Sequence, residues 1–214
     1  MHFRNAFVGG LSALAFVASA SAGLRVTEAM SSSGSGGTAD WFEVSNYGTT
    51  AIDITGYKMD DNSFNFANAV ALSGITSIGA GETVIFVEGA AGDVAGFRSF
   101  WGGLSGVQVG YYSGSGASFS SGGDGVVVFN GSGSEVTQRA TFGAATSGSS
   151  FYFDSTGTAA GVVSTVGTIG TQVTFATSGN PVNIGSLGTA LNIPAPGAVA
   201  LVALAGVMAR RRSA

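Results

Sequence analysis

The stretch DWFEVSNYG, residues 40–48, has the pattern of a half-buried β-strand that runs into a turn. Its alternation puts Phe42 and Val44 on one side of a sheet. Trp41 and Glu43 then face the other side. The Asn and Gly at the end of the stretch are residues that form tight turns. This pattern predicts a strand with a different chemistry on each face.

Similar short runs, separated by Gly, Ser and Asn, recur along the chain and predict further strands. The predicted strands are LRVTEAM (24–30), ADWFEVSN (39–46), AIDI (51–54), GYKMDD (56–61), ETVIFVEG (82–89), VQVGYY (107–112), GVVVFN (125–130), EVTQRATFG (135–143), SFYF (150–153) and QVTFAT (172–177). NGSG (130–133) predicts a hairpin turn. DVAGFRSFWG (93–102) instead has helical spacing, and predicts one or two helical turns capped by Asp93. The spacing of the strands favours a sandwich of antiparallel strands over βαβ units.

The composition supports this fold class and excludes several others. Gly accounts for 36 of the 214 residues and charged residues for only 9%. Helical bundles are disfavoured because an interior Gly costs a helix about 1 kcal/mol relative to Ala. Charge-driven disorder is disfavoured because 45% of the residues are hydrophobic. All 12 acidic residues lie between residues 24 and 193, whereas half of the 8 basic residues lie at the two ends. Such an anionic domain is not expected to bind nucleic acid.

The side chains that the chain lacks limit its chemistry. The sequence has no Cys, and its single His is His2. Catalysis by a Ser-His-Asp or Cys-His arrangement needs an imidazole, as do most zinc and haem sites. Paired carboxylates remain as the one catalytic option, with candidates Glu28, Glu43, Glu82 and Glu88, but nothing in their spacing marks a pair. We therefore expect no enzyme activity.

The N-terminal segment, 1–22, has the features of a secretory signal peptide. Arg4 supplies the positive charge, and an apolar run follows from Ala6 to Ala18. The small residues of ASASAG (18–23) then fit the requirement of a signal peptidase. We expect a signal helix here, and an exported protein.

The C-terminal segment, 193–214, has three consecutive parts: IPAPG, an apolar run over 197–209 and three arginines. An apolar run of 13 residues is short for a membrane span of about 20 residues. The arginines favour a cytoplasmic end for this apolar helix. The segment resembles the PEP-CTERM sorting signal, with Ala195 in place of that family's central Glu. The resemblance implies sorting by an exosortase through Pro194, Pro196, Arg210, Arg211 and Arg212, and delivery to the cell surface or matrix of a bacterium.

The middle of the chain, 23–192, resembles the lamin-tail domain, an immunoglobulin-like β-sandwich. DWFEVSNYG (40–48) is similar to a signature of that family, in which Asp-Trp, Glu and Asn recur around aliphatic residues. The other similar pieces occur in the same order: LRVTEAM (24–30), IDITGYKMDD (52–61), IGAGETVIFVEG (78–89), GGDGVVVFNGSGSEV (122–136) and NIGSLG (183–188). The resemblance implies a binding or architectural role without catalysis. The structural signature residues are Glu28, Asp40, Trp41, Glu43, Asn46 and Asp124.

Other residues have both a structural and a functional interpretation. Trp41 could stack on a sugar, but we expect it in the core, with Glu28 and Glu43 bonded to turn amides. Asp60, Asp61 and Asn62 offer the oxygen ligands that calcium prefers, although they lack the EF-hand spacing. We expect Asp124 to form an Asx turn. The aromatic residues Trp101, Tyr111 and Tyr112 are expected under the sandwich, with an exposed binding loop as the alternative.

Together these features predict a non-catalytic exported protein of the cell surface or extracellular matrix, acting in adhesion or scaffolding. The alternative is a carbohydrate-binding module that serves a surface polysaccharide system. The expected partners are the sorting machinery, the membrane through the tail, and surface polysaccharide or envelope proteins. No cofactor is expected apart from the calcium candidate.

Overall fold

The computed structural model describes residues 23–34, 37–154, 161–165, 175–176 and 183–190. The expected signal helix and the expected tail, with its prolines and arginines, lie outside the described residues. Within the described part of the chain, no helix has the length and apolar character needed to cross a membrane.

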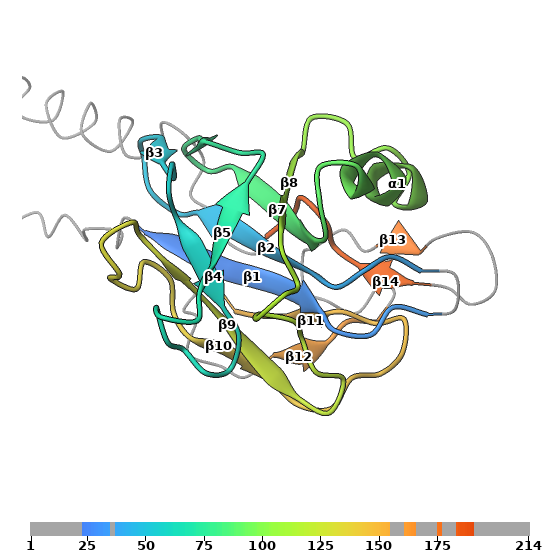
Figure 1. The fold of residues 1–214 in the computed structure, drawn as a ribbon. Helices are drawn as coiled ribbons and strands as arrows, with labels where there is room; N and C mark the ends of the chain where they lie inside the picture. The colour runs from blue at the N-terminus through green and yellow to red at the C-terminus, as the bar shows by residue number, and fades with distance from the viewer. Residues whose placement is uncertain (1–22, 35–36, 155–160, 166–174, 177–182, 191–214) are drawn as a thin grey trace, which may run out of the picture.

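The described residues form an all-β fold with a single helix among them (Figure 1). The elements are β1 (Leu24–Met30), β2 (Trp41–Asn46), β3 (Ile52–Asp53), β4 (Lys58–Asp60), β5 (Val70–Ser73), β6 (Ser77–Ile78), β7 (Thr83–Glu88), α1 (Asp93–Phe100), β8 (Gln108–Tyr112), β9 (Asp124–Phe129), β10 (Ala140–Phe142), β11 (Phe151–Tyr152), β12 (Val162–Val163), β13 (Phe175–Ala176) and β14 (Ile184–Gly185). Ten strands are joined in the order β10-β9-β4-β5-β8-β7-β2-β1-β11-β12. The pairs β3–β6 and β13–β14 stand apart from this sheet.

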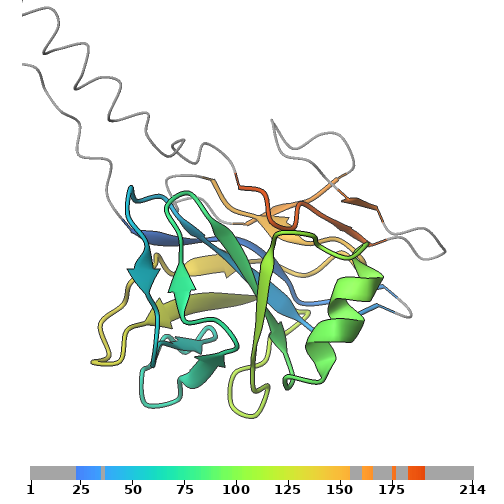
Figure 2. The ribbon, with the colours of Figure 1, turned by 90° about the horizontal axis from the view of Figure 1, so that it is seen from above.

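The long sheet folds over a first core, as Figures 1 and 2 show from two directions. Phe42 and Phe86 enter this core from the central strands β2 and β7, and their rings stack with centroids 5.5 Å apart. Val126 and Val128 enter it from β9 in the other half of the sheet. The two halves therefore form the two layers of a sandwich.

A second core lies on the opposite face of the central strands, under α1. Trp41 and Val87 supply this core from β2 and β7, and Phe97 supplies it from the helix. Figure 2 shows α1 at the side of β7 and β8. Because both faces of β2 are covered, all six of its residues are buried.

The strands predicted over 24–30, 39–46, 82–89, 107–112 and 125–130 are confirmed with small changes in their ends. The short helix is confirmed, and its Phe97 is buried as the spacing predicts. The cap is wrong: Gly92 occupies the N-cap position, and Asp93 instead accepts a hydrogen bond from the backbone N–H of Ala90 at 2.8 Å. The hairpin turn at 130–133 is confirmed, since the N–H of Asn130 donates to the carbonyl of Ser134 at 2.9 Å.

The expectation of antiparallel strands without a βαβ unit is wrong at one place. β7 and β8 are parallel, with Val84 opposite Gln108 and Glu88 opposite Tyr112. A parallel pair needs a crossover of a dozen or more residues, and α1 with its flanking loops supplies it. The predicted strand 135–143 is also reduced to β10 and an isolated bridge at Glu135.

Candidate functional site

A β-bulge in β1 creates the most unusual site among the described residues. The register between β1 and β2 shifts between Val26 and Glu28. A bulge inserts one extra residue and breaks the alternation of a strand. As a result, the Thr27 hydroxyl forms a hydrogen bond with Glu43, and Glu28 also stands directly opposite Glu43 on β2. Two fully buried carboxylates thus face each other on neighbouring strands.

Glu28 holds the segment 183–188 against the sheet. The backbone N–H of Ser186 donates to Glu28 Oε1 at 2.8 Å, and the Ser186 hydroxyl donates to Oε2 at 2.8 Å. The hydroxyl of Ser150 also donates to Oε1. Hydrogen bonds to a charged acceptor are stronger than neutral ones. Glu28 is therefore surrounded by donors, which suits an ionised carboxylate.

Glu43 has a different set of partners. The backbone N–H of Gly188 donates to its Oε2 at 2.6 Å. Its Oε1 lies 2.8 Å from the hydroxyl of Thr27, which starts a buried chain of hydroxyls through Ser45 to Thr83 at 2.9 and 2.8 Å. A hydroxyl donates or accepts according to its rotation. The Thr27 hydroxyl donates to Glu43 Oε1 in the structure, and rotation of these hydroxyls would let Thr27 accept instead when Glu43 carries a proton.

Burial dominates the electrostatics of this carboxylate pair. Desolvation raises the pKa of Glu28 to about 7, although its hydrogen bonds to Ser150 and Ser186 oppose the change. Desolvation also raises the pKa of Glu43 well above its usual value, and the negative charge of Glu28 raises it further. Burial and the charge of Glu28 therefore make Glu43 the carboxyl that we expect to keep a proton.

No basic side chain among the described residues neutralises this pair. The described part of the chain has four basic residues, and each has partners elsewhere. Arg25 lies over Tyr47, Lys58 over Phe66, Arg98 donates to the carbonyls of Leu104 and Val107, and Arg139 pairs with Glu135. Among the described residues, the negative charge of this pair is therefore reduced by a proton that one of the two carboxyl groups keeps.

Trp41 is fully buried in the second core. Its ring lies 6.1 Å from Phe97 and 5.9 Å from Trp101, both in edge-to-face geometry. Its indole N–H has no hydrogen-bond partner. The structure therefore places Trp41 in packing contacts, with no surface for stacking on a sugar.

Asn46 connects two turns at the end of β2. Its side-chain N–H₂ donates to the carbonyls of Ile78 and Gly79 at 3.0 and 2.9 Å, and to Thr50 at 2.9 Å. Its side-chain oxygen accepts from the N–H of Gly48 at 2.8 Å. Every polar atom of this amide is used within the fold.

The calcium candidates Asp60, Asp61 and Asn62 are arranged as a turn. Asp60 accepts from the hydroxyl of Ser63 at 2.6 Å, while Asp61 accepts from the Ser63 N–H at 3.1 Å. The backbone N–H of Asn62 donates to Asp124 at 3.0 Å. Within the described ranges, no three or more His, Cys, Asp or Glu side chains are grouped to hold a metal ion.

Asp124 joins loops and does not close the Asx turn expected from the sequence. Besides the bond from Asn62, it accepts from its neighbour Gly125 at 2.7 Å and from the backbone N–H of Ser120. An Asx turn requires a donor two residues further on. The carboxylate instead ties the loop after β4 to the loop before β9.

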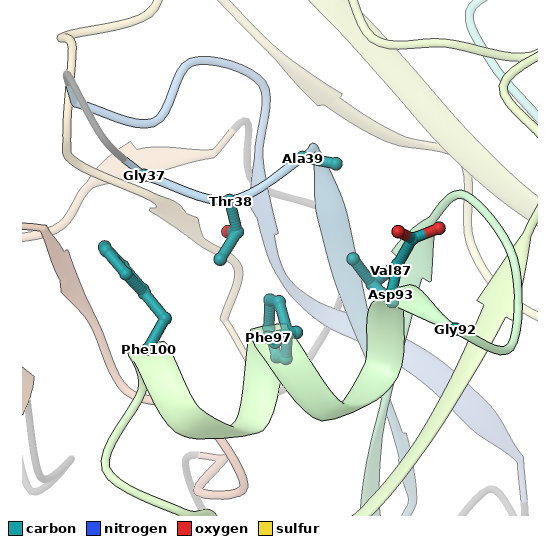
Figure 3. Close-up of a pocket in the computed structure, with 9 residues that line it drawn as sticks. Gly37, Thr38, Ala39, Val87, Gly92, Asp93, Phe97 and Phe100 are labelled. Carbon is teal, nitrogen blue, oxygen red and sulfur yellow. The ribbon is translucent and has the colours of Figure 1, made fainter.

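A surface groove lies between α1 and the segment that leads into β2 (Figure 3). It has a volume of about 400 Å³. Phe97 and Phe100 rise from the helix toward this segment, and Thr38 points back toward the helix. The hydroxyl of Thr38 is buried without a hydrogen-bond partner. No sequence pattern predicts this groove, because it depends on how the helix docks on the sheet.

The aromatic residues near the Gly/Ser-rich region lie mainly inside the fold. Trp101 and Tyr112 are buried, and Tyr111 is partly buried. The one large hydrophobic residue that is exposed among the described residues is Val162. An exposed aromatic binding loop is absent from this part of the structure.

These features define a class of protein: an immunoglobulin-like sandwich whose signature residues Glu28, Glu43, Asn46 and Asp124 make hydrogen bonds within the fold. A family model of the lamin tail domain matches residues 17–143, more than half of the chain. The chain belongs to the lamin tail domain family. That domain is a structural, immunoglobulin-like domain, and it is not a known catalytic family. No curated protein and no solved structure matches the chain.

The family match ends before several elements that the structure adds. β11 pairs with β1 and β12 pairs with β11, so the sheet extends past the matched residues. The segment that bonds to Glu28 and Glu43 also lies beyond residue 143. The buried carboxylates inside the matched region thus depend on a segment outside it.

Proposed function

We propose that this chain is a non-catalytic exported protein that acts as a scaffold or adhesion module at the cell surface or in the extracellular matrix. The observation that carries this proposal is the use of its acidic residues. Glu28 and Glu43 are fully buried and hydrogen-bonded within the fold. A catalytic carboxylate must reach its substrate, and these two do not reach the surface.

Export and surface delivery form the second part of the proposal. Residues 1–22 supply the signal peptide, and residues 193–214 supply a PEP-CTERM-like tail that passes the protein to bacterial sorting machinery. Intact-mass analysis of the protein from fractionated cells tests both ends at once. Removal of a signal peptide near residue 22 and recovery with the envelope or matrix support the proposal. An intact N-terminus on cytoplasmic material contradicts it.

The three terminal arginines provide a sharper test of the tail. Replacing Arg210, Arg211 and Arg212 by Ser keeps the apolar run but removes the charge that holds its end at the cytoplasmic face. We expect release into the medium or mislocalisation, with the sandwich still folded. Lys at the same three positions is the matched control, and it restores retention if charge alone is read.

The groove beside α1 favours carbohydrate binding as a second candidate function. Asp93 supplies an exposed carboxylate there, and Phe100 supplies a partly buried ring. Sugars bind to sites that combine an aromatic face with polar groups. Binding of purified protein to a panel of surface polysaccharides tests this function.

A groove-filling variant distinguishes the groove from the rest of the surface. A Cβ at Gly96, which lines the groove, would meet nothing within 4 Å, so Gly96→Phe has room to fill it. Gly143→Phe adds the same side chain at another open position outside the groove. Loss of polysaccharide binding in the first variant alone supports this function, and equal binding by both variants contradicts it.

A further inference from the structure

Three oxygen-bearing side chains form a row across the central strands, at the end opposite Asn46. The N–H of Glu88 donates to the carbonyl of Asp40 at 2.8 Å, which extends the pairing of Trp41 with Val87 by one residue. Asp40 and Glu88 are therefore cross-strand neighbours. Glu88 is in turn the register partner of Tyr112 on the parallel strand β8.

All three side chains point to the same face of the sheet. Asp40 and Glu88 each lie two residues from a member of the first core, Phe42 and Phe86. Alternate residues of a strand share one face. Tyr112 itself belongs to the first core, with its ring 5.5 Å from that of Phe42. The row therefore closes one end of the sandwich interior.

The polar atoms of this row lack partners. No described residue donates a hydrogen bond to the carboxylate of Asp40 or of Glu88, and both side chains are only partly buried. The Tyr112 hydroxyl is fully buried and has no hydrogen-bond partner. Buried polar groups are nearly always paired with protein, water or an ion. The buried Tyr112 hydroxyl beside two part-exposed carboxylates therefore indicates room for a ligand that all three can reach.

The charge around this end of the core is negative. Asp124 of β9 adds a third carboxylate from the facing layer, although its own oxygens are occupied by backbone N–H groups. Burial, then Glu88, and then Asp124 raise the pKa of Asp40 to about 7. Tyr112 is the register partner of Glu88 and shares its face of the sheet, so its hydroxyl is on the same side as the two carboxylates. None of the four basic residues in the described part of the chain forms an ion pair with Asp40 or Glu88, so a ligand at this site is expected to be cationic.

We propose that Asp40 and Glu88 bind one hard divalent cation, of which Ca²⁺ is the test case, with the hydroxyl of Tyr112 directed at the same site. Oxygen ligands of mixed type suit the flexible coordination of Ca²⁺, and water completes its shell. Two protein carboxylates are a low charge count for a calcium site. The expected dissociation constant is therefore in the range of about 10⁻⁴–10⁻³ M, as in extracellular modules.

The position of Glu88 is supported by a glycine. Its carboxylate lies against the backbone of Gly114, where an added Cβ would collide with Oε1. Gly114→Ala would therefore displace the carboxylate without removing its charge. This variant tests whether the geometry of the row, in addition to its charge, is needed for the cation.

The experiment is calorimetric titration of the full-length chain with CaCl₂ after chelator treatment, together with thermal melts in Ca²⁺ and in EDTA. We expect one site per chain, and a Tm rise of about 3–6 °C when Ca²⁺ exceeds the dissociation constant tenfold. Asp40→Asn and Glu88→Gln should each weaken binding by at least about tenfold. Asp53→Asn is the matched control, because it removes one charge at an exposed position.

The melts in EDTA distinguish a variant that has lost the cation site from a variant that has lost its fold. Because each substitution removes a like charge from the row, both variants should melt at or above the parent temperature in EDTA. A variant that is folded in EDTA and gains no stability from Ca²⁺ supports the site. A parent protein that shows neither heat nor a Tm rise with Ca²⁺ overturns it, as does a double Asp40→Asn, Glu88→Gln variant that binds like the parent.

Discussion

Glu43→Gln should make the stability of the domain less dependent on pH. Glutamine reproduces a protonated Glu43: its oxygen can accept from the N–H of Gly188, and its amide can donate to Thr27. The substitution removes the titration of Glu43 and leaves that of Glu28. The parent and the variant should therefore have similar stability near pH 5, and they should diverge as the pH rises.

The sign and the size of the effect follow from the raised pKa values. In the folded protein a carboxyl with a raised pKa still holds its proton at a pH where the unfolded chain has released it. The free energy of unfolding then falls as the pH rises, by about 1.4 kcal/mol per pH unit for each such proton. For Glu28, whose pKa rises from 4.5 to about 7, the total is about 3 kcal/mol, lost between these two pH values. Glu43 adds a loss of the same sign, because its pKa is raised by burial and by Glu28. Removing Glu43 should therefore reduce the slope by up to about 1.4 kcal/mol per pH unit.

The assay is urea unfolding at pH 5, 6, 7 and 8, followed by the fluorescence of the buried Trp41 and Trp101. Two controls define the specificity of the effect. Glu135→Gln removes a carboxylate at the surface and should keep the slope of the parent. Glu28→Gln also removes a carboxylate with a raised pKa, so it should reduce the slope as well and serves as the comparison for Glu43→Gln.

One result would refute the reasoning. If Glu43→Gln loses stability with pH as steeply as the parent, the retained proton does not reside on Glu43.

Three further substitutions test packing, each by its free energy of unfolding. Trp41→Ala should cost about 3–5 kcal/mol, because it empties the centre of the second core; a cost under 1 kcal/mol would contradict this packing role. Gly96→Ala should add about 1 kcal/mol, since its Cβ meets nothing within 4 Å and Ala is the better helix former; a loss of stability would show that the helix is strained there. Gly110→Ala should cost about 1–3 kcal/mol, because its Cβ would lie 2.9 Å from the ring of Phe86 and would also press on the carbonyl of Ser73; no change would mean that β8 moves freely.

The sequence was most informative where alternation and turn residues occur together. β2, β7 and β9 combine aromatic or β-branched residues with Gly or Asn at their ends, and each is found near its predicted place. β5 (Val70–Ser73) was missed because AVALSG carries little alternation and small side chains. The resemblance to the lamin-tail domain was found from ordered pieces of sequence, and the family match supports it.

The predicted strand 135–143 is shorter in the structure because two of its side chains make the hydrogen bonds that the backbone of a strand would make. The segment 135–143 has the composition of a strand, but Gln138 uses its side-chain amide to bond both the N–H and the carbonyl of Val26, at 3.2 and 2.7 Å. Thr137 likewise accepts from the N–H of Val128 at 3.0 Å. Propensity does not distinguish a residue that pairs through its backbone from one that pairs through its side chain.

The site was foreseen only in part, because its geometry depends on contacts between distant segments. The sequence suggested that Glu28 and Glu43 bond to turn amides, and the structure identifies the donors as Ser186 and Gly188. The bulge in β1 had no signal in the alternation. The row of Asp40, Glu88 and Tyr112 depends on the parallel pairing of β7 with β8, which the sequence did not predict.

The hydrogen bonds of the carboxylate pair also affect when folding can finish during synthesis. They join residues separated by 158 and 145 positions in the chain. β1 and β2 leave the ribosome first, and the backbone donors of Ser186 and Gly188 reach their two acids only after residue 188 has been made. Long sequence separations of this kind slow folding, so we expect the nascent chain to remain loosely structured until that segment arrives. A chain cut short before residue 183 would keep only the hydroxyl donors of Thr27 and Ser150 for these two acids, so we expect it to be less stable than the full chain.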